Sequence, residues 1–467
     1  MVFSSIGFLY VFLPAVLFVY YIAPRRCRNS ILLVFSLAFY YIGEQKLVII
    51  MLFSALTDYC CSIFIERFRN RKAITRIFLC LSLIVNLSLL GYFKYADLFI
   101  SSFNGVFGTA LPLLKIALPI GISFYTFQTM SYTIDVYRGD IKAEKNFISF
   151  TTYVTLFPQL IAGPIVRYET IACELHDRKT TLDGFASGIR RFCVGLGKKV
   201  LIANTLAGLS QMYDKANTHT VLFAWVCAIA VPLQIYFDFS GYSDMAIGLG
   251  RMFGFNFPEN FNYPFVSRSA TEFWRRWHIT LGTWFKDYVY IPMGGNRVNP
   301  TRHIFNLLVV WFATGLWHGA AYNFILWGLY YGVLLTAEKF LYIKHLEKSE
   351  LFSHIYFILI TVTGFEIFSA NSLADIAKRF GELVGIGAAG FTNTESSYYS
   401  LSYLTVLIIA VVLSVPLLKN LMNKFEKHRY FNATYKYSAY AACIGLLIIS
   451  TAYLIDGSYN PFLYFRF

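Results

Sequence analysis

Charged residues are scarce in this chain of 467 residues. Asp, Glu, Lys and Arg together make up 14%, whereas soluble globular domains carry roughly a quarter. Nine apolar residue types supply 57% of the chain, which excludes disorder. A water-soluble domain is also excluded, because too few polar side chains remain to cover its surface. The composition predicts an all-α polytopic membrane protein.

The motifs of soluble enzymes are also lacking. The sequence contains no GxSxG elbow, Walker loop or HExxH motif. Its eight cysteines show no metal-ligand or disulfide spacing and are interpreted as small hydrophobic residues. Without a repeat or a low-complexity linker, residues 1–467 are expected to form a single membrane domain. The first apolar segment has no positive leader or cleavage site, so we expect a retained span.

The net charge of +14 does not require a nucleic-acid partner, because cytoplasmic loops of membrane proteins collect Lys and Arg. Basic residues follow the first apolar segment at Arg25 and Arg26, and follow the third at 67–76. This pattern predicts an external N-terminus and cytoplasmic basic loops. Continued alternation places residues 240–303 in the cytoplasm and the C-terminus outside.

About 11–13 apolar helical segments are expected, several of them shorter than the roughly 20 residues that cross a bilayer upright. They are residues 2–23, 31–42, 47–65, 77–93, 111–134, 147–165, 200–212, 221–239, 304–316, 320–337, 352–368, 401–418 and 437–454. Segment 147–165 contains two X-Pro steps, and segment 304–316 is interrupted by Gly315 and followed by Gly319. Irregular backbone at membrane depth is tolerated only inside protein or beside a polar cavity. Short or re-entrant segments here therefore predict an internal site.

Residues 240–303 form a segment too polar to span and unusually aromatic. At 100° per residue, Trp277, Leu281 and Trp284 fall on the same face as Trp274. This pattern predicts one amphipathic helix from Trp274 to Tyr288 that lies on the inner leaflet.

His318 is the strongest candidate for chemistry. It lies between Gly315 and Gly319 in an apolar run, near the bilayer midplane by the predicted topology. Ionisable groups at that depth are costly and commonly functional. Burial favours the neutral imidazole, as a general base requires. The alternative is a histidine hydrogen-bonded between helices, and the residues alone do not decide between them.

His278 is a weaker candidate, because a histidine beside Arg275 and Arg276 can belong to a helix that faces lipid headgroups. The other histidines form no constellation and are expected to be solvated. They are His176, His219, His303, His345, His354 and His428.

Asp238 and Asp244 lie where a span is expected to give way to the cytoplasmic segment. For Asp238 we favour a buried structural pairing, and for Asp244 the cap of a helix start. Support of the histidine site is the alternative for both.

Four basic residues of the same segment form a field that could hold the phosphates of a donor such as coenzyme A. They are Arg275, Arg276, Lys286 and Arg297. Contact with lipid phosphate explains them equally well.

A series of short motifs runs in order along the chain. They are FSS at 3–5, FLP at 12–14, FKY at 93–95, LPIGISF at 118–124, SYTIDVYRG at 131–139, FPQLIAGPI at 157–165, PENFNYP at 258–264, EFWRRWHI at 272–279, DYVYIPMGGNR at 287–297 and WHG at 317–319. This series resembles the membrane-bound O-acyltransferase family, in its bacterial polysaccharide O-acetylation branch. The resemblance covers nearly the whole chain. It departs at Ser369, where that branch often has Arg.

The resemblance implies that His318 is the family's intramembrane catalytic histidine and that His278 is its second, cytoplasm-side histidine. Trp317 and Asn296, which belong to the same motifs, are candidate supporting residues. It also implies a ring of helices around a thin central region, with a funnel from the cytoplasm to the histidine.

The same resemblance implies transfer of an acetyl group from acetyl-CoA to an extracytoplasmic cell-envelope polysaccharide. No bound cofactor or metal is expected. The implied partners are the lipid bilayer, the polysaccharide acceptor and an extracytoplasmic acyltransferase of SGNH type, and the implied location is the inner (cytoplasmic) membrane of a bacterium.

Three competing functions stay open on the sequence alone. A D-alanyl transfer protein for teichoic acid shares much of the motif series, although the IPMGGNR continuation at 291–297 favours acetyl transfer. Broken helices also suit a transporter or flippase, but no symmetry between halves is visible. A structural scaffold would leave histidine substitutions without effect.

Overall fold

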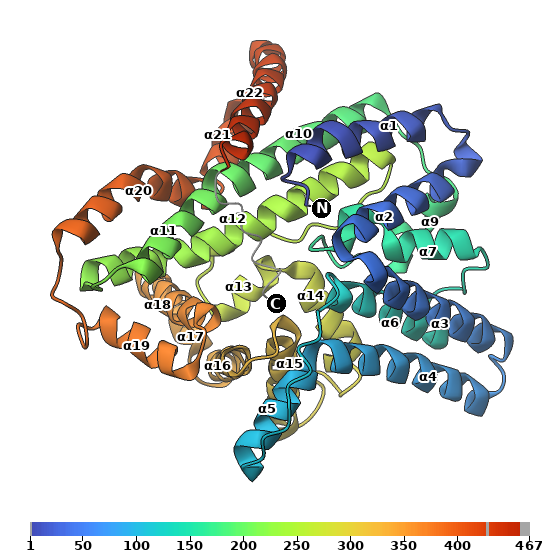
Figure 1. The fold of residues 1–467 in the computed structure, drawn as a ribbon, viewed down its shortest axis with the longest axis horizontal. Coiled ribbons are helices and arrows are strands. Elements are labelled where there is room, and N and C mark those ends of the chain that lie inside the picture. The colour runs from blue at the N-terminus through green and yellow to red at the C-terminus, as the bar shows by residue number, and fades with distance from the viewer. Residues whose placement is uncertain (1, 426–428, 458–467) are drawn as a thin grey trace. The chain divides into compact units, whose positions relative to one another are not determined.

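The computed structural model describes residues 2–425 and 429–457, and within those ranges the chain forms helices without a strand. This confirms the all-α prediction. The chain divides into two compact units, whose helices are labelled in Figure 1. Unit 1 comprises residues 1–192 and 245–258, and unit 2 comprises residues 193–244 and 259–467.

Unit 1 is built from the N-terminal helices. They are η1 (Phe8–Phe12), α1 (Leu13–Ile22), η2 (Arg25–Cys27), α2 (Arg28–Glu44), η3 (Gln45–Leu47), α3 (Val48–Arg67), α4 (Lys72–Leu90), η4 (Gly91–Tyr95), α5 (Ala96–Phe107), α6 (Ile122–Arg138), α7 (Phe147–Thr155), α8 (Phe157–Leu160), α9 (Tyr168–His176) and most of α10 (Leu182–Gly197). Helices α3, α4 and α6 pack side by side. A cluster of phenylalanine rings, among them Phe8, Phe39 and Phe157, fills part of its core.

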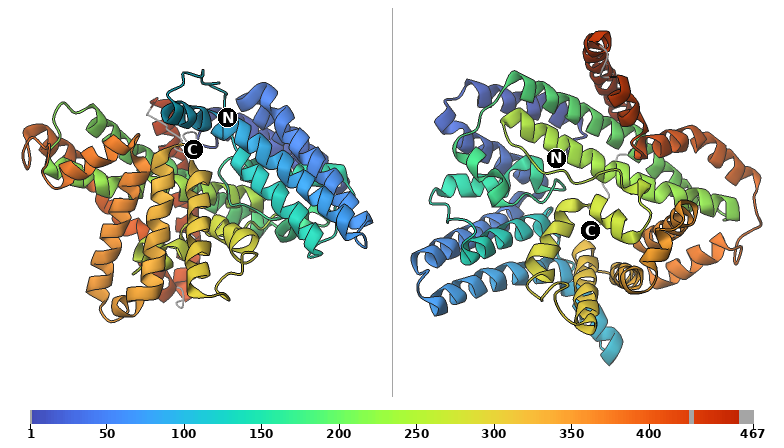
Figure 2. Two further views of the ribbon diagram at one scale, coloured as in Figure 1. Left: turned by 90° about the horizontal axis from the view of Figure 1, so that it is seen from below. Right: turned by 180° about the vertical axis from the view of Figure 1, so that it is seen from behind.

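Unit 2 contains the remaining helices. They are η5 (Lys198–Ala203), α11 (Asn204–Lys215), most of α12 (Val221–Phe253), η6 (Pro264–Val266), α13 (Ala270–Arg276), α14 (Ile279–Phe285), η7 (Lys286–Tyr290), α15 (Pro300–His318), α16 (Tyr322–Ala337), η8 (Glu338–Tyr342), α17 (Ile343–Leu346), α18 (Glu350–Ser369), α19 (Leu373–Leu383), α20 (Thr394–Ser414), α21 (Leu417–Phe425) and α22 (Arg429–Ile455). Helix α16 packs against α15 on one side and α18 on the other (Figure 2).

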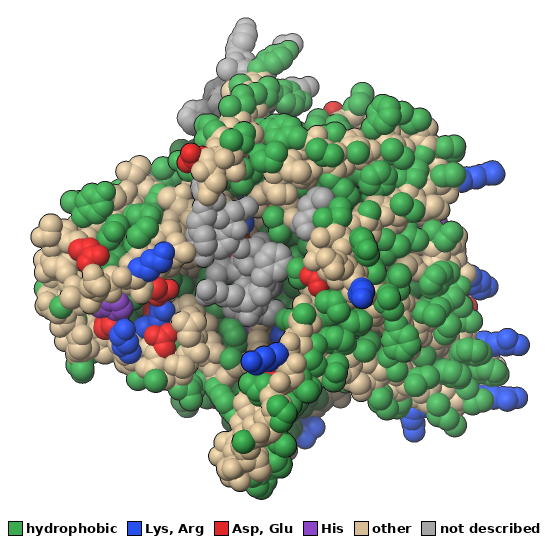
Figure 3. Space-filling view, in the orientation of Figure 1, with side chains coloured by type: hydrophobic (Ala, Val, Ile, Leu, Met, Phe, Trp, Pro, Cys, Tyr) green, Lys and Arg blue, Asp and Glu red, His purple; other side chains and the backbone are tan. Residues whose placement is uncertain are grey.

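Eight helical segments among the described residues are long and apolar enough to cross a membrane. They are Arg25–Arg67, Lys72–Phe107, Leu182–Lys215, Val221–Phe253, Tyr322–Leu346, Glu350–Ser369, Thr394–Ser414 and Tyr437–Ile455. Large apolar side chains such as Phe53 and Ile84 stand exposed on them, and apolar side chains cover much of the visible surface (Figure 3). Such a surface is suited to lipid. The chain is therefore a multi-pass membrane protein.

The structure corrects the predicted boundaries of the 240–303 segment. Helix α12 runs without interruption to Phe253, so its last turns include residues 240–253, which the sequence had assigned to the cytoplasmic segment. The predicted helix from Trp274 to Tyr288 is also wrong. The chain forms α13, breaks at Trp277 and His278, and resumes as α14. Because Trp277, Leu281 and Trp284 are at most 4% exposed, their face packs within protein rather than on a leaflet.

The two predicted helix interruptions have different outcomes. Residues 147–165 do break, between α7 and α8 and again after Leu160. Gly315, in contrast, lies inside the continuous helix α15, which ends only at His318. A glycine in a helix of this kind can serve close packing instead of a bend, as the geometry around His318 shows.

Candidate functional site

His318 is positioned by close packing of α15 against α16. A Cβ atom added to Gly315 would lie 2.4 Å from the backbone oxygen of Phe324, and one added to Gly328 would lie 2.4 Å from that of Trp311. The two backbones therefore touch where side chains are missing. At Gly319 the chain turns to extended backbone. His318 is consequently the last helical residue, three positions beyond the closest contact.

Aromatic rings enclose the His318 imidazole, which is 5% exposed. Its ring centroid lies 4.9 Å from that of Trp327 on α16, 5.4 Å from that of Phe368 on α18 and 5.0 Å from that of Trp317. Asn323 donates a 3.1 Å hydrogen bond to the Phe368 backbone oxygen, which ties the end of α18 to the start of α16. Three helices thus fix the position of one imidazole.

His278 occupies the break between α13 and α14 with a positive φ of 45°. Few residues other than glycine and asparagine adopt this conformation. Asn260 holds it in place: its Oδ1 lies 3.1 Å from His278 Nδ1 and also accepts from the backbone N–H and the hydroxyl of Thr280. Its backbone oxygen accepts from the Ile279 N–H at 3.0 Å. The strained turn is therefore stabilised by one asparagine.

This contact also assigns the tautomer of His278. Asn260 Oδ1 can only accept, so Nδ1 carries the proton and Nε2 presents a lone pair. Nε2 is buried and has no hydrogen-bond partner among the described residues. Burial, and secondly His318, hold the pKa of His278 well below its ordinary value. The neutral imidazole is thus a buried base with an available lone pair.

The structure brings the two candidate histidines together within unit 2. His278 packs against Trp317 with ring centroids 5.6 Å apart, and Trp317 immediately precedes His318. Phe239 of α12 covers another side of His278, with centroids 4.6 Å apart. The result is a buried, aromatic-walled site with two imidazoles, which is suited to general acid–base chemistry.

The predicted buried pairing of Asp238 is confirmed: its Oδ1 lies 2.6 Å from Lys199 Nζ, and both side chains are at most 5% exposed. The predicted capping role of Asp244 is wrong. Asp244 lies inside α12, where no helix begins, and its carboxylate pairs with Lys198 at 2.7 Å. Both carboxylates join α12 to η5.

The four basic candidates differ in their surroundings. Arg275, Lys286 and Arg297 are exposed, as is Asn296. Arg276 instead pairs with Glu272 at 2.9 Å and donates to the backbone oxygen of Asn262 at 3.2 Å. Arg276 thus serves the local fold, while the first three present free surface charge.

Two histidines expected to be solvated are not. His303 is 4% exposed, with Nε2 2.8 Å from the Tyr290 hydroxyl. His219 Nδ1 lies 2.7 Å from Glu382. The His303–Tyr290 and His219–Glu382 contacts form only in the folded protein, and the residues next to each histidine in the sequence give no sign of them. His345 is exposed, His354 contacts the Glu350 backbone oxygen, and His428 lies outside the described residues.

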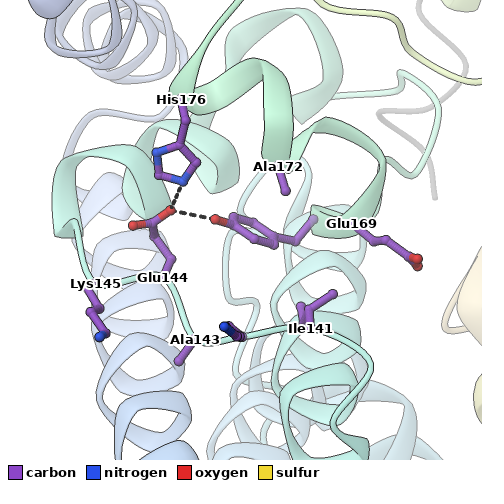
Figure 4. Close-up of a pocket in the computed structure, with 9 residues that line it drawn as sticks. Ile141, Ala143, Glu144, Lys145, Glu169, Ala172 and His176 are labelled. Atoms are coloured by element: carbon purple, nitrogen blue, oxygen red, sulfur yellow. Dashed lines mark hydrogen bonds and ion pairs between the residues drawn. The ribbon is translucent and has the colours of Figure 1, made fainter.

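His176 belongs to a separate polar cluster in unit 1 (Figure 4). Its Nε2 lies 2.8 Å from the buried Glu144 carboxylate, which also accepts a 2.5 Å hydrogen bond from the Tyr168 hydroxyl. The side chains line an open cavity of about 430 Å³ together with Lys142 and Glu169. Charges of both signs surround it, and the imidazole itself is 58% exposed as predicted.

Sequence reasoning missed the residues that shape the histidine pair. Asn260 was part of a recognised motif but had no assigned role, because a loop asparagine has no periodic signal. Trp327 comes from the next helix, α16, and Phe368 from the more distant α18, and both meet His318 only in the folded unit. In the sequence, both are aromatic residues within apolar runs, and such residues cannot be distinguished from ordinary core residues.

This fold and the buried histidine pair fit a membrane-embedded acyltransferase. The sequence model described as "MBOAT, membrane-bound O-acyltransferase family" matches residues 31–373, and the chain belongs to this family. Family membership decides against the transporter and scaffold alternatives, and the protein is an acyltransferase.

Among its relatives, the "Probable alginate O-acetylase AlgI" of Azotobacter vinelandii is 42% identical over 423 residues, which cover 89% of this chain and 84% of the relative. The "Peptidoglycan O-acetyltransferase" of Helicobacter pylori is 31% identical over 525 aligned positions, which cover 100% and 98%. The "Teichoic acid D-alanyltransferase" of Bacillus subtilis is 30% identical over 235 positions, covering 47% of this chain and 59% of the relative.

Proposed function

We propose that this protein takes an acetyl group from acetyl-CoA on the cytoplasmic side and passes it across the membrane for O-acetylation of an extracytoplasmic cell-envelope polysaccharide. The observation that carries the proposal is the buried His278–Trp317–His318 arrangement, in which one imidazole presents an unpaired Nε2. Similarity along most of the chain to relatives named for alginate and peptidoglycan O-acetylation supports acetyl as the group transferred.

His318 acts as the general base in this proposal. Its imidazole removes the proton from the acceptor hydroxyl as the oxygen attacks the thioester carbonyl. The carbon–sulfur bond then breaks, and the departing thiolate takes the proton from the imidazolium. An acyl-imidazole formed first on His318 gives the same net transfer and is the alternative. His278 Nε2 supplies a second lone pair for a hydrogen bond from the reacting thiol or hydroxyl.

The donor's phosphates bind the exposed cations of the 275–297 region in this proposal. Arg275, Lys286 and Arg297 are free at the surface, whereas Arg276 is engaged with Glu272. Diphosphate and 3′-phosphate groups of coenzyme A are suited to such a field. Contact with lipid phosphate is the competing explanation.

The acceptor lies beyond the membrane in this proposal, and delivery involves a separate extracytoplasmic acyltransferase of SGNH type. The bacterial relatives and the apolar helices support the inner membrane as the location. The polysaccharide is of the class that the relatives' names describe, an alginate-like polymer or peptidoglycan.

His318→Ala tests the proposed base. The purified variant should release free coenzyme A from acetyl-CoA about 100-fold to 10,000-fold more slowly than the parent, the usual range for loss of a positioned base. His345→Ala is the matched control, because His345 is exposed on α17 and should leave the rate unchanged. Parent-like turnover by folded His318→Ala protein would overturn the assignment.

Deletion of the gene distinguishes acetyl from D-alanyl transfer. We expect ester-linked acetate to be lost from one envelope polysaccharide while D-alanine on teichoic acid stays unchanged. The opposite result, loss of D-alanine with acetate retained, would favour the teichoic-acid alternative. The Bacillus subtilis D-alanyltransferase aligns with 47% of this chain.

A further inference from the structure

Glu338 is a fully buried carboxylate outside the histidine pair. It lies at the start of η8, directly after α16, and is 0% exposed. A buried carboxylate is costly unless hydrogen bonds compensate its lost hydration. Its contacts therefore indicate what the residue holds.

The hydrogen bonds of this carboxylate go to the start of α13 and to the neighbouring α18. Oε1 accepts from the Ala270 N–H at 2.6 Å, and Oε2 accepts from the Thr271 N–H at 2.8 Å and the Thr271 hydroxyl at 2.6 Å. The Tyr356 hydroxyl of α18 donates to Oε1 at 3.0 Å. Three donors from two consecutive residues fix both the place and the direction of the first turn of α13.

Helix α13 in turn determines where His278 lies. It is only seven residues long, from Ala270 to Arg276, and His278 follows two residues after its end. The Trp277 N–H donates to the Phe273 backbone oxygen at 2.9 Å, and the Asn262 N–H donates to that of Arg276 at 2.9 Å. A shift at the start of so short a helix is carried to the break that contains His278.

The same helix that precedes Glu338 also contacts His318. Trp327 of α16 packs on the His318 ring and on the ring of Trp274 in α13, with centroids 4.9 Å and 5.4 Å apart. Trp327 and Glu338 are eleven residues apart, roughly 16 Å along a helix axis. Helix α16 and its continuation η8 thus contact His318 through Trp327 and hold the start of α13 through Glu338.

We propose that Glu338 is a positioning residue, which sets the separation of the two histidines by locking the start of α13 to α16. This inference rests on the proposed role of His278. Glu338 does not itself touch the reacting groups. It acts through α13, so its loss should lower kcat and leave the KM for acetyl-CoA nearly unchanged.

Glu338→Gln tests the idea, because the amide nitrogen places a donor against the N–H or hydroxyl of Ala270 or Thr271. A displacement of about 1 Å can reduce turnover about 100-fold, so we expect kcat to fall about 10-fold to 100-fold. Thr271→Val is the milder variant, which removes one hydrogen bond at constant shape and should lower kcat about fivefold. Glu350→Gln is the matched control, since Glu350 forms an exposed pair with Arg268 at 2.7 Å.

A pH profile separates positioning from a general structural role. If α13 loosens, water reaches His278 and its pKa rises toward the ordinary value, so the acid limb of kcat should move to higher pH in Glu338→Gln. Parent-like kcat, or a lower kcat with an unmoved acid limb, would overturn the proposal. If Glu338→Gln does not fold, Thr271→Val decides by the same two readouts. His278→Ala is measured in parallel: full activity there would refute the proposed role of His278 and not the contact geometry of Glu338.

Discussion

Gly315→Ala should reduce acetyl transfer strongly although it adds a single methyl group. The added Cβ would lie 2.4 Å from the Phe324 backbone oxygen, whereas ordinary contact begins at 3.4 Å. Both elements are helix backbone, so no side-chain rotation relieves the overlap, and α15 must move from α16 by about 1 Å. His318 moves with α15, whereas Trp327 stays with α16. A misplacement of that size costs about 100-fold in rate, and overpacking costs about 1–3 kcal/mol of stability.

The assay is release of coenzyme A from acetyl-CoA by purified variants, together with their thermal unfolding midpoints. Gly282→Ala in α14 is the matched control, because the nearest atom to its added Cβ is 3.9 Å away. That control should be fully active and equally or slightly more stable, since alanine is the better helix former. Parent-like kcat in folded Gly315→Ala protein would refute the claim that this contact sets the position of His318.

The remaining predictions concern donor binding and pH. Arg275→Ala and Lys286→Ala should each raise the KM for acetyl-CoA about threefold to tenfold without lowering kcat, and this effect should weaken at high salt. A KM equal to that of the parent at low salt would favour contact of these residues with lipid phosphate instead. Because the folded-state pKa of His278 is lowered, its contribution to stability is present above about pH 6.5 and is lost as the pH falls below that value. Unfolding midpoints measured from pH 8 to pH 5 should therefore fall less steeply for His278→Gln than for the parent, and identical slopes would contradict the burial of a neutral imidazole.

Local composition predicted the membrane environment, most of the helices and the buried pairing of Asp238. The lack of charge identified a membrane protein, and the apolar runs located most of its helices, since both depend only on which solvent surrounds each segment. The predicted segment 111–134 is an exception, because the helix there begins only at Ile122. A histidine in an apolar run between glycines likewise marked the site at His318. The buried pairing of Asp238 was predictable because a carboxylate at the end of an apolar span needs a partner.

Periodicity misled wherever a tertiary contact overrides local preference. The aromatic spacing from Trp274 onward suggested one helix, but Asn260 stabilises a positive φ at His278 and divides it. Asp244 resembled a helix cap, yet a favourable pair with Lys198 lets α12 continue through it. In both cases a residue distant in sequence supplies the hydrogen bond or charge that settles the backbone.

The sequence by itself determined that the protein is surrounded by lipid and built of helices, because both follow from residue type and immediate neighbours. It singled out His318 as the candidate base without deciding its role. Only the tertiary structure decided how His278 meets His318, since that depends on backbone contact at Gly315, ring packing at Trp327 and the carboxylate of Glu338. Each of these contacts joins different helices, and their energies exist only after the helices have packed.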